Sequence, residues 1–346
     1  MATRTRLVLL FGGRSAEHDV SCVSARHVAA AADPDRFDVV AVGITRSGQW
    51  RLVELGDPLP DRLATDGPRV APADIFAEPD TVVFPLVHGP LGEDGTLQGL
   101  LEVADIAYVG SGVLASAVCM DKTMAKLVCA HQGLPQCRYR TATANDDAAR
   151  VAEEAIADLG LPLFVKPANM GSSVGVSRAT TAAETIRALE VAGRYDHALV
   201  IEEEVNGQEI EVAVLGNAEP TASMPGEIVP GAAFYDYADK YLTDGAELLI
   251  PARLSEAATA EAQHLAEVAY RALQCEGMAR VDFLYDADGR GMLISEINTI
   301  PGFTPISMYP RLWQASGLAY PQLIETLVEL AVERYERRRR HRRVDL

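Results

Sequence analysis

The chain of 346 residues is 48% hydrophobic and 23% charged, as in ordinary folded, water-soluble proteins, and its length predicts two or three domains. Its 49 acidic residues outnumber its 31 basic residues, for a net charge of −18. This charge excludes nucleic-acid binding by bulk electrostatics, so an anionic ligand must be held by a few local cations, backbone N–H groups or a metal.

The cysteines and the first residues predict where the protein works. The five cysteines include no CxxC pair, which is typical of a reduced protein rather than of a disulfide framework or a zinc site. The apolar run at residues 7–11 is too short for a signal peptide or a membrane span. We therefore expect a cytoplasmic protein that contacts neither a membrane nor nucleic acid.

The chain opens with a βαβ pattern. Residues 7–11 predict a buried parallel strand, a glycine turn follows, and Ser15 is a candidate N-cap for a helix that leads to a strand at 38–44. Such units bind ligands at the carboxyl ends of their strands. Glu17 lies in the first turn of the helix, where it either only stabilises the helix dipole or holds an ammonium group.

The next segment continues the same sheet. Residues 49–80 are rich in Pro and Asp and are interpreted as a variable connection, whereas 81–87 predict a strand and 96–103 a helix. The loop at 88–95 would lie at the ligand edge. The GxGxxA motif at 110–115 resembles a dinucleotide fingerprint but lacks the acid expected about twenty residues later. Residues 116–131 predict one helix.

A second domain is predicted to begin near residue 133. An amphipathic helix at 146–159 and a strand at 163–165 lead into Lys166 and a Gly-Ser-Ser-x-Gly loop at 171–175. Consecutive N–H groups and hydroxyls in such a loop can cradle phosphate, and Lys166 favours this interpretation over a plain hairpin turn. The P-loop pattern GxxxxGK[ST] does not occur in the sequence.

The third domain is predicted to begin near residue 210. A strand at 199–202 ends in acids that can accept hydrogen bonds from an adenine amino group or ribose hydroxyls, and a second strand spans 210–215. The weakly periodic, aromatic segment 225–248 is interpreted as a lid loop. Residues 255–273 predict an amphipathic helix.

A hairpin at 280–297 is the most informative stretch. If Asp286 faces Met292, then Asp282 faces Glu296 and Arg280 faces Asn298. Opposed carboxylates repel, so we expect a cation between them, and their oxygen donors suit Mg²⁺. The alternative is a hairpin with charges on a solvated face.

Two features follow the hairpin. Thr304 and Pro305 predict a helix start, which would place an anion-binding N-terminus beside the cation. The interpretation is a metal–polyphosphate centre with a carboxylate pocket next to it. From Arg334 onward seven arginines face two acids, and this tail predicts a frayed, solvated helix end, with an interaction arm as the alternative.

Four motifs together resemble the D-alanine–D-alanine ligases of the ATP-grasp superfamily: GGxSAEH at 12–18, HG…GEDG at 88–95, KP…GSSVG at 166–175 and EINTIPGFT at 296–304. The resemblance spans residues 7–330. It implies an α/β fold of three domains: a doubly wound N-terminal sheet domain at 1–121 that binds the first D-alanine, a central ATP-grasp subdomain at 122–208, and a C-terminal subdomain at 209–346 with the metal site and lid. It also implies a homodimer.

The resemblance further implies roles for individual residues. ATP would be bound by Lys122, Lys166, Ser172, Ser173 and Lys240, with Glu202 at the adenine and Glu209 at the ribose. Two Mg²⁺ or Mn²⁺ ions would be bound by Asp282, Glu296 and Asn298. The first D-alanine would lie against His88 and a trio of Glu17, Ser172 and Tyr241, and the second against Arg280, Gly302 and Ser307.

The implied chemistry is that of a carbon–nitrogen ligase in peptidoglycan synthesis, and hence in cell wall biogenesis and cell shape. The first amino acid would be phosphorylated to an acyl phosphate, and the second would attack it while Arg280 stabilises the oxyanion. Related D-alanine–D-lactate ligases carry a histidine where Tyr241 stands, so D-alanine is favoured as second substrate. The alternatives are a dinucleotide-dependent oxidoreductase and a non-catalytic amino-acid sensor.

Overall fold

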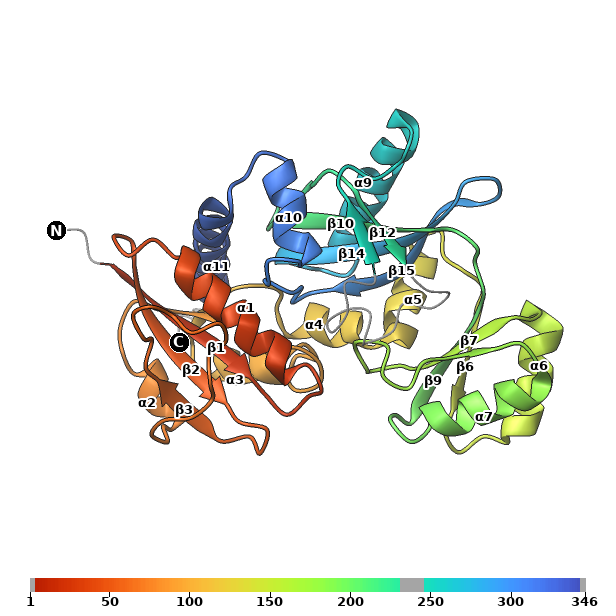
Figure 1. Ribbon diagram of the computed structural model, residues 1–346, viewed down its shortest axis with the longest axis horizontal. Coiled ribbons are helices and arrows are strands. Elements are labelled where there is room, and N and C mark those ends of the chain that lie inside the picture. The colour runs from red at the N-terminus through yellow and green to blue at the C-terminus, as the bar shows by residue number, and fades with distance from the viewer. Residues whose placement is uncertain (1–3, 231–245, 343–346) are drawn as a thin grey trace.

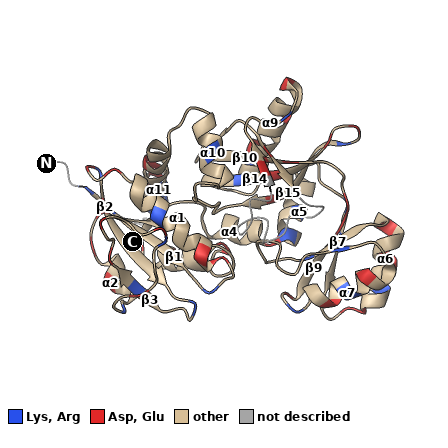
Figure 2. Cartoon of the chain, viewed as in Figure 1, with Lys and Arg blue, Asp and Glu red and all other residues tan. Residues whose placement is uncertain are grey.

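The computed structural model describes residues 4–230 and 246–342, which form three β-sheets arranged side by side, each with its own helices (Figure 1). Acidic and basic residues are distributed over all three parts (Figure 2). None of the described helices is long and apolar enough to cross a membrane. Lys240 and Tyr241 lie outside the described residues, as does the segment from 231 to 245 predicted to be the centre of a lid.

The first sheet has five strands in the order β3-β2-β1-β4-β5, parallel except for the edge strand β3. Helices α1 (His18–Ala31) and α3 (Thr96–Val103) pack against it. The sheet confirms the predicted doubly wound N-terminal unit. Its strands are β1 (Thr5–Gly12), β2 (Phe37–Ile44), β3 (Trp50–Val53), β4 (Thr81–Pro85) and β5 (Ala107–Tyr108).

The second sheet has four strands in the order β6-β9-β7-β8, with every pair antiparallel. Helices α6 (Ala148–Leu159) and α7 (Ala182–Ala192) bury their apolar faces on it to form a separate core. The strands are β6 (Tyr139–Thr143), β7 (Leu163–Pro167), β8 (Ser177–Ala179) and β9 (Ala198–Glu203).

The third sheet has six strands, with β13-β12-β10-β14-β15 in a row and β11 beside β10. Helix α9 (Glu256–Ala272) packs on one side together with α4 (Val113–Met120) and α5 (Lys122–His131), while α10 (Met308–Ala315) packs on the other. The strands are β10 (Gln208–Gly216), β11 (Thr221–Ala222), β12 (Gly226–Pro230), β13 (Ala246–Leu249), β14 (Gly277–Asp286) and β15 (Gly291–Asn298).

Two expectations about connections are wrong. Residues 49–80, expected to be a variable connection, contain β3 and the short helix α2 (Pro72–Phe76). The described ends of the expected loop at 225–248 are the paired strands β12 and β13 rather than loop. Both misjudged segments contain strands of only four or five residues, which carry too few residues for a clear alternation of apolar and polar side chains.

Three predicted helix starts also differ from the structure. The single helix expected at 116–131 is broken at Asp121, whose carboxylate caps α5 by accepting hydrogen bonds from the N–H groups of Thr123 and Met124. Helix α1 begins at His18 rather than after Ser15: the Ser15 hydroxyl accepts from the Glu17 N–H and donates to the carbonyl of His88, which holds residues 15–17 in a turn before the helix. Helix α10 begins at Met308, and residues 304–307 form a separate turn.

The last helix, α11 (Tyr320–Arg342), corrects the interpretation of the arginine-rich tail as a frayed end. Arg334 is 1% exposed and donates to the carbonyl oxygens of Tyr108 (3.0 Å) and Gly110 (2.6 Å), with its guanidinium 4.0 Å from the centre of the Tyr108 ring. Arg337 and Arg338 pair with Glu276 and Glu102. The arginines therefore fasten α11 to the first sheet's domain and to the start of β14 in the third sheet.

The same contacts account for the glycine motif at 110–115. Its Gly110 carbonyl accepts from Arg334, and a side chain at Gly277 would come within 3.1 Å of the Gly110 backbone. The glycines thus permit a close approach between the first and third sheets. This packing removes the basis for a dinucleotide site at this loop.

We expect Arg334→Met to lower the free energy of unfolding by about 2–4 kcal/mol, because two buried carbonyls lose a charged donor and Tyr108 loses its cation. Denaturant titration followed by circular dichroism measures the change. The control is Arg340→Met, an exposed arginine on the same helix, which should cost less than about 0.5 kcal/mol. Equal effects of the two substitutions would contradict the buried clamp.

Candidate active site

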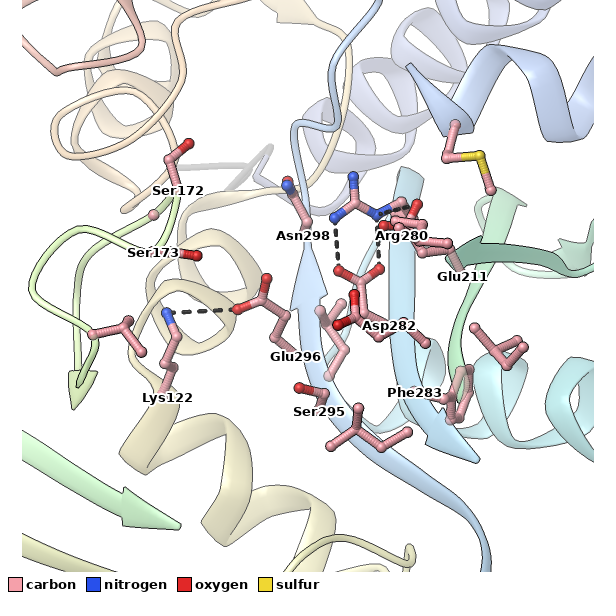
Figure 3. A pocket seen from close by; sticks show the side chains of 18 of the residues that line it. Lys122, Ser172, Ser173, Glu211, Arg280, Asp282, Phe283, Ser295, Glu296 and Asn298 are labelled. Carbon is pink, nitrogen blue, oxygen red and sulfur yellow. Dashed lines mark hydrogen bonds and ion pairs between the residues drawn. The ribbon is translucent and has the colours of Figure 1, made fainter. Parts of the chain in front are cut away.

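A cavity of about 1050 Å³ is lined by residues from all three sheets' domains. Figure 3 shows the part of its wall formed by the serine loop, Lys122 and the third sheet. All the predicted site residues that the structure describes line this one cavity. They are Glu17, His88, Lys122, Lys166, Ser172, Ser173, Glu202, Glu209, Arg280, Asp282, Glu296, Asn298, Gly302 and Ser307. The structure therefore brings together side chains that lie up to 290 positions apart in the sequence.

A β-bulge places the acids of the hairpin in the cavity. Near the turn the strands pair one residue out of the predicted register, with Asp286 opposite Gly291 rather than Met292. The register then shifts between Asp282 and Phe283, so that Asp282 lies opposite Glu296 and Arg280 opposite Asn298, as predicted. Ser295 is the extra residue, and it reverses the alternation of side chains along β15.

The burial pattern shows what this reversal achieves. Ile294 and Ile297, three residues apart, are both buried in the core under α9, whereas Glu296 and Asn298 line the cavity. Without the bulge Glu296 would share the core-facing side of Ile294. Because bulges often re-aim side chains next to active sites, this irregularity supports a functional role for Glu296.

Arg280 is bonded to acids on two strands. Its guanidinium donates to both Asp282 oxygens, at 2.7 and 2.6 Å, and its Nε lies 3.1 Å from a Glu211 oxygen. Burial alone would lower the pKa of Arg280, but Asp282, Glu211 and Glu296 raise it well above its usual value, so it stays cationic. Glu211 was not among the predicted site residues; its signal was an acid between the apolar Ile210 and Val212 of strand β10.

Lysines approach the acids from the second sheet and from α5. Lys122 donates to the carbonyl of Met170 at 2.8 Å, and its Nζ lies 3.7 Å from a Glu296 oxygen. Lys166 lies 2.5 Å from one oxygen of Glu202, and Lys126, for which no role was predicted, lies 2.7 Å from the other. The predicted contact of Glu202 with adenine stays a prediction.

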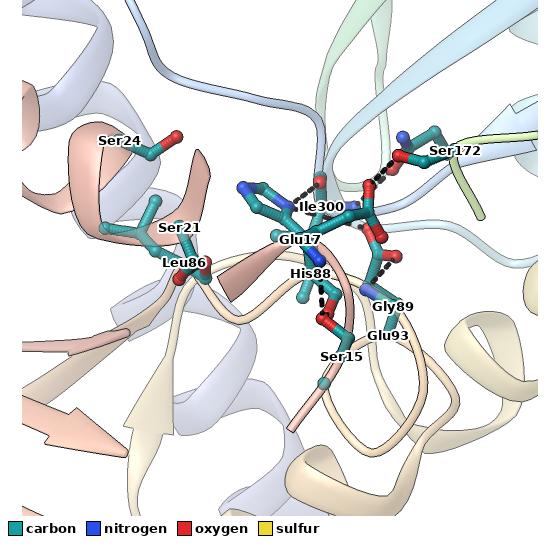
Figure 4. Close-up of polar contacts among 12 residues, drawn as sticks. Ser15, Glu17, Ser21, Ser24, Leu86, His88, Gly89, Glu93, Ser172 and Ile300 are labelled. Atoms are coloured by element: carbon teal, nitrogen blue, oxygen red, sulfur yellow. Dashed lines mark hydrogen bonds and ion pairs between the residues drawn. The ribbon is translucent and has the colours of Figure 1, made fainter. Parts of the chain in front are cut away.

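The serine loop does more than turn a hairpin. It does join the antiparallel strands β7 and β8, but Ser172 Oγ donates a 2.5 Å hydrogen bond to Glu17 of the first sheet's domain (Figure 4). Ser172 and Ser173 have φ angles of +50° and +58°, a conformation that non-glycine residues rarely adopt and that clusters at functional sites. The loop thus bridges two parts of the cavity wall.

His88 is held in one tautomer beside this bridge. Its Nδ1 lies 3.1 Å from the carbonyl oxygen of Ile300, which can only accept, so Nδ1 carries a proton. Burial would lower the pKa of His88, but Glu93 and Glu17 raise it. Glu93, a further residue that the sequence argument missed, accepts a hydrogen bond from the Gly89 N–H at 2.7 Å and orients the 88–95 loop.

The turn after β15 replaces the helix start predicted at Thr304. The Ser307 hydroxyl accepts a hydrogen bond from the Thr304 N–H at 3.0 Å and lies 2.8 Å from the Thr304 hydroxyl. This local bonding competes with helix formation and delays α10 to Met308. A side chain at Gly302 would come within 2.6 Å of Ser307 Oγ, so the turn requires glycine there.

Known proteins resemble the chain over nearly its whole length. Family models described as D-ala D-ala ligase N-terminus and C-terminus match residues 6–111 and 128–329. A D-alanine–D-alanine ligase of Shouchella clausii is 47% identical, and ligase A of Chromobacterium violaceum is 46% identical, with 96% of each chain covered in both comparisons.

Solved structures agree with these sequence matches. The D-alanine-D-alanine ligase from Coxiella burnetii superposes with a TM-score of 0.83 at 35% identity, covering 98% of this chain and 97% of its own. The VanG D-Ala:D-Ser ligase from Enterococcus faecalis gives 0.81 at 32% identity, covering 95% and 100%. The fold is therefore shared with these ligases over nearly the whole chain.

We expect Ser172→Ala to loosen the serine loop, because the Ser172 hydroxyl donates the hydrogen bond that joins this loop to Glu17 in the first sheet's domain. Hydrogen exchange of the Val174 and Val176 amides, which donate within the loop, should accelerate about tenfold. Ser173→Ala removes a neighbouring hydroxyl for which the described residues provide no hydrogen bond, and should leave exchange unchanged. Equal exchange in both variants would exclude the bridge.

Proposed function

We propose how the cleft works from one premise: this chain belongs to the D-alanine–D-alanine ligase family and has its ATP-grasp fold. The enzyme joins two D-alanine molecules into D-alanyl-D-alanine at the expense of ATP, for the synthesis of peptidoglycan. The observation that carries the assignment of sites is one cavity that brings together the acids of the hairpin, lysines from α5 and the second sheet, and Glu17 from the first sheet's domain.

The nucleotide is proposed to lie between the second and third sheets. Lys122, Lys166 and the Ser172-Ser173 loop would hold the phosphates, and the acids at 202 and 209 the adenosine. The loop contributes backbone N–H groups as well as hydroxyls, which is a phosphate-binding arrangement that needs no excess of basic residues. This suits a chain whose net charge is −18.

The donor set at the hairpin fits Mg²⁺ or Mn²⁺. Asp282, Glu296 and Asn298 supply carboxylate and amide oxygens on one face of the sheet, and such hard oxygens suit these ions. When bound, the metal would offset the negative charge of the transferring phosphoryl group. Glu211 offers Arg280 a second carboxylate, so Asp282 can turn toward a cation while the guanidinium remains paired.

The first D-alanine is proposed to bind beside Glu17, which would hold its ammonium group, while His88 lies near its carboxylate. The raised pKa of His88 favours the cation, which suits an anionic carboxylate. Phosphorylation of that carboxylate would give an acyl phosphate. The Ser172 bond to Glu17 closes the second sheet's loop over this position and helps to exclude the water that would hydrolyse it.

The second D-alanine is proposed to bind at Arg280, Ser307 and the Gly302 amide. A guanidinium can hold a carboxylate through two parallel hydrogen bonds, and Arg280 would also stabilise the oxyanion as the amine attacks the acyl phosphate. Holding the two small molecules head to tail supplies much of the rate, because it converts a bimolecular encounter into an oriented one.

A homodimer is proposed from the apolar residues left exposed on α3, α4 and α5, which contact one another in sequence order. These residues are Leu100, Val103, Val113, Leu114, Met124 and Leu127, and a contiguous exposed apolar surface is typical of an interface. Light scattering should give twice the chain mass of 37.2 kDa. A cytoplasmic location is supported by five buried cysteines without disulfides.

The direct test of the function is product identification by mass spectrometry after mixing the enzyme with ATP, Mg²⁺ and D-alanine. D-alanyl-D-alanine and ADP should form together, and chelation by EDTA should stop both. L-alanine is the matched control, and D-serine and D-lactate test the second position. Binding of D-alanine without ADP release would identify a sensor rather than a ligase.

We expect Glu296→Gln to separate stability from activity. Turnover should fall at least about 100-fold, because the metal loses an ionised ligand. The unfolding temperature should hold or rise, since the repulsion between Glu296 and Asp282 across the strands is removed. Glu190→Gln, an exposed substitution on α7, is the control for both readouts. Near-normal turnover in Glu296→Gln would refute the metal assignment.

A further inference from the structure

A buried trio of charges lies behind the proposed phosphate site. Glu202 on β9 is 4% exposed and has one oxygen 2.7 Å from Lys126 Nζ on α5 and the other 2.5 Å from Lys166 Nζ on β7. Lys126 is itself 3% exposed. Two lysines thus share a single carboxylate, and the trio has a net charge of +1.

All three groups of the trio are ionised. Burial alone would raise the pKa of Glu202, but the two lysines lower it far below its ordinary value. Burial would likewise lower the pKa of Lys126, but Glu202 raises it. The Glu296 carboxylate, which also raises the pKa of Lys166, offsets the excess positive charge of the trio only from a distance, so the trio is suited to receive an anion from the cavity.

The two lysines differ in their freedom to meet that anion. Lys126 is enclosed: its ammonium lies 5.0 Å from the centre of the Tyr139 ring and 3.6 Å from Cys137 Sγ, and its side chain does not line the main cavity. The Lys166 side chain is 20% exposed and lines the cavity. Lys166 is therefore the member that can exchange Glu202 for a ligand.

We propose that Lys126 is a positioning residue for the nucleotide phosphates: it keeps Glu202 neutralised, so that Lys166 can bind phosphate without leaving a buried carboxylate unpaired. This inference rests on the proposed role of Lys166 at the phosphates. Without Lys126, Glu202 and Lys166 form a neutral pair. Phosphate must then break a buried ion pair to reach Lys166, and the site no longer offers a net positive charge.

The test measures the contribution of the phosphates to binding. Affinity for ATP is compared with affinity for adenosine, measured as a competitive inhibitor, so that any adenine contact of Glu202 cancels in the ratio. We expect Lys126→Met to weaken ATP binding about tenfold while adenosine affinity and the KM for D-alanine hold. Lys126→Arg should restore ATP affinity, because arginine keeps the charge.

A second substitution gives the sharpest outcome. In Lys126→Met/Glu202→Gln the competing carboxylate is gone, so Lys166 is released and the ratio of ATP to adenosine affinity should return toward that of the unmodified enzyme. Glu202→Gln alone should keep or increase the ratio of ATP to adenosine affinity. If Lys126→Met does not fold, this variant still tests whether Lys166 exchanges Glu202 for phosphate. Arg187→Met, which removes a cation at an exposed position on α7, is the control for net charge.

Three results would overturn the inference. The first is an equal loss of ATP and adenosine affinity in Lys126→Met, which indicates a structural role alone. The second is a double variant that binds ATP no better than Lys126→Met. The third is a Lys126→Met variant that binds ATP with unchanged affinity, although the separate Lys166→Met variant binds ATP weakly. If Lys166→Met itself binds ATP normally, the proposed phosphate site fails as well, and the two failures are thereby distinguished.

Discussion

The cavity is built around a row of three acidic side chains that lie side by side on neighbouring strands of the third sheet. Glu211 on β10 lies opposite Asp282 on β14, which lies opposite Glu296 on β15. Carboxylates in such cross-strand positions destabilise a sheet unless cations lie between them. Arg280 compensates one end of the row and Lys122 approaches the other. The sheet therefore carries an excess of acid that a metal can complete, and the cavity forms around it.

The other cations of the cavity follow the same rule. In a chain with a net charge of −18, a lysine that faced an anion site alone would be drawn to the nearest acid. Here Lys166 and Asp282, which are proposed to meet ligands, are already paired, and a third residue stays with the partner that each of them would leave. Lys126 does this for Glu202, and Glu211 does it for Arg280. Anion binding then becomes an exchange of partners, which avoids uncovering a buried charge.

The sequence predicted which residues come together better than it predicted the strand geometry that brings them together. The types and spacing of Asp282 and Glu296 indicated a cation site, because period-two alternation and opposed acids are local properties. The bulge at Ser295 could not be predicted, since it depends on packing against α9, and the pairing expected at the turn was off by one residue. Arg334 was misjudged for the same reason: its partners at 108 and 110 are distant in sequence and are backbone carbonyls.

The cores indicate which part of the molecule can open. Residues of the first and third sheets share one hydrophobic cluster with α10 and α11, and Arg334 adds hydrogen bonds across that boundary. The second sheet's cluster, in contrast, contains only residues from 142 to 201. A part with its own core moves at low cost, whereas the joined pair cannot separate without exposing apolar surface. The second sheet is thus the part that can move at the lowest cost, and the Ser172–Glu17 hydrogen bond is one of the contacts that such a movement would break.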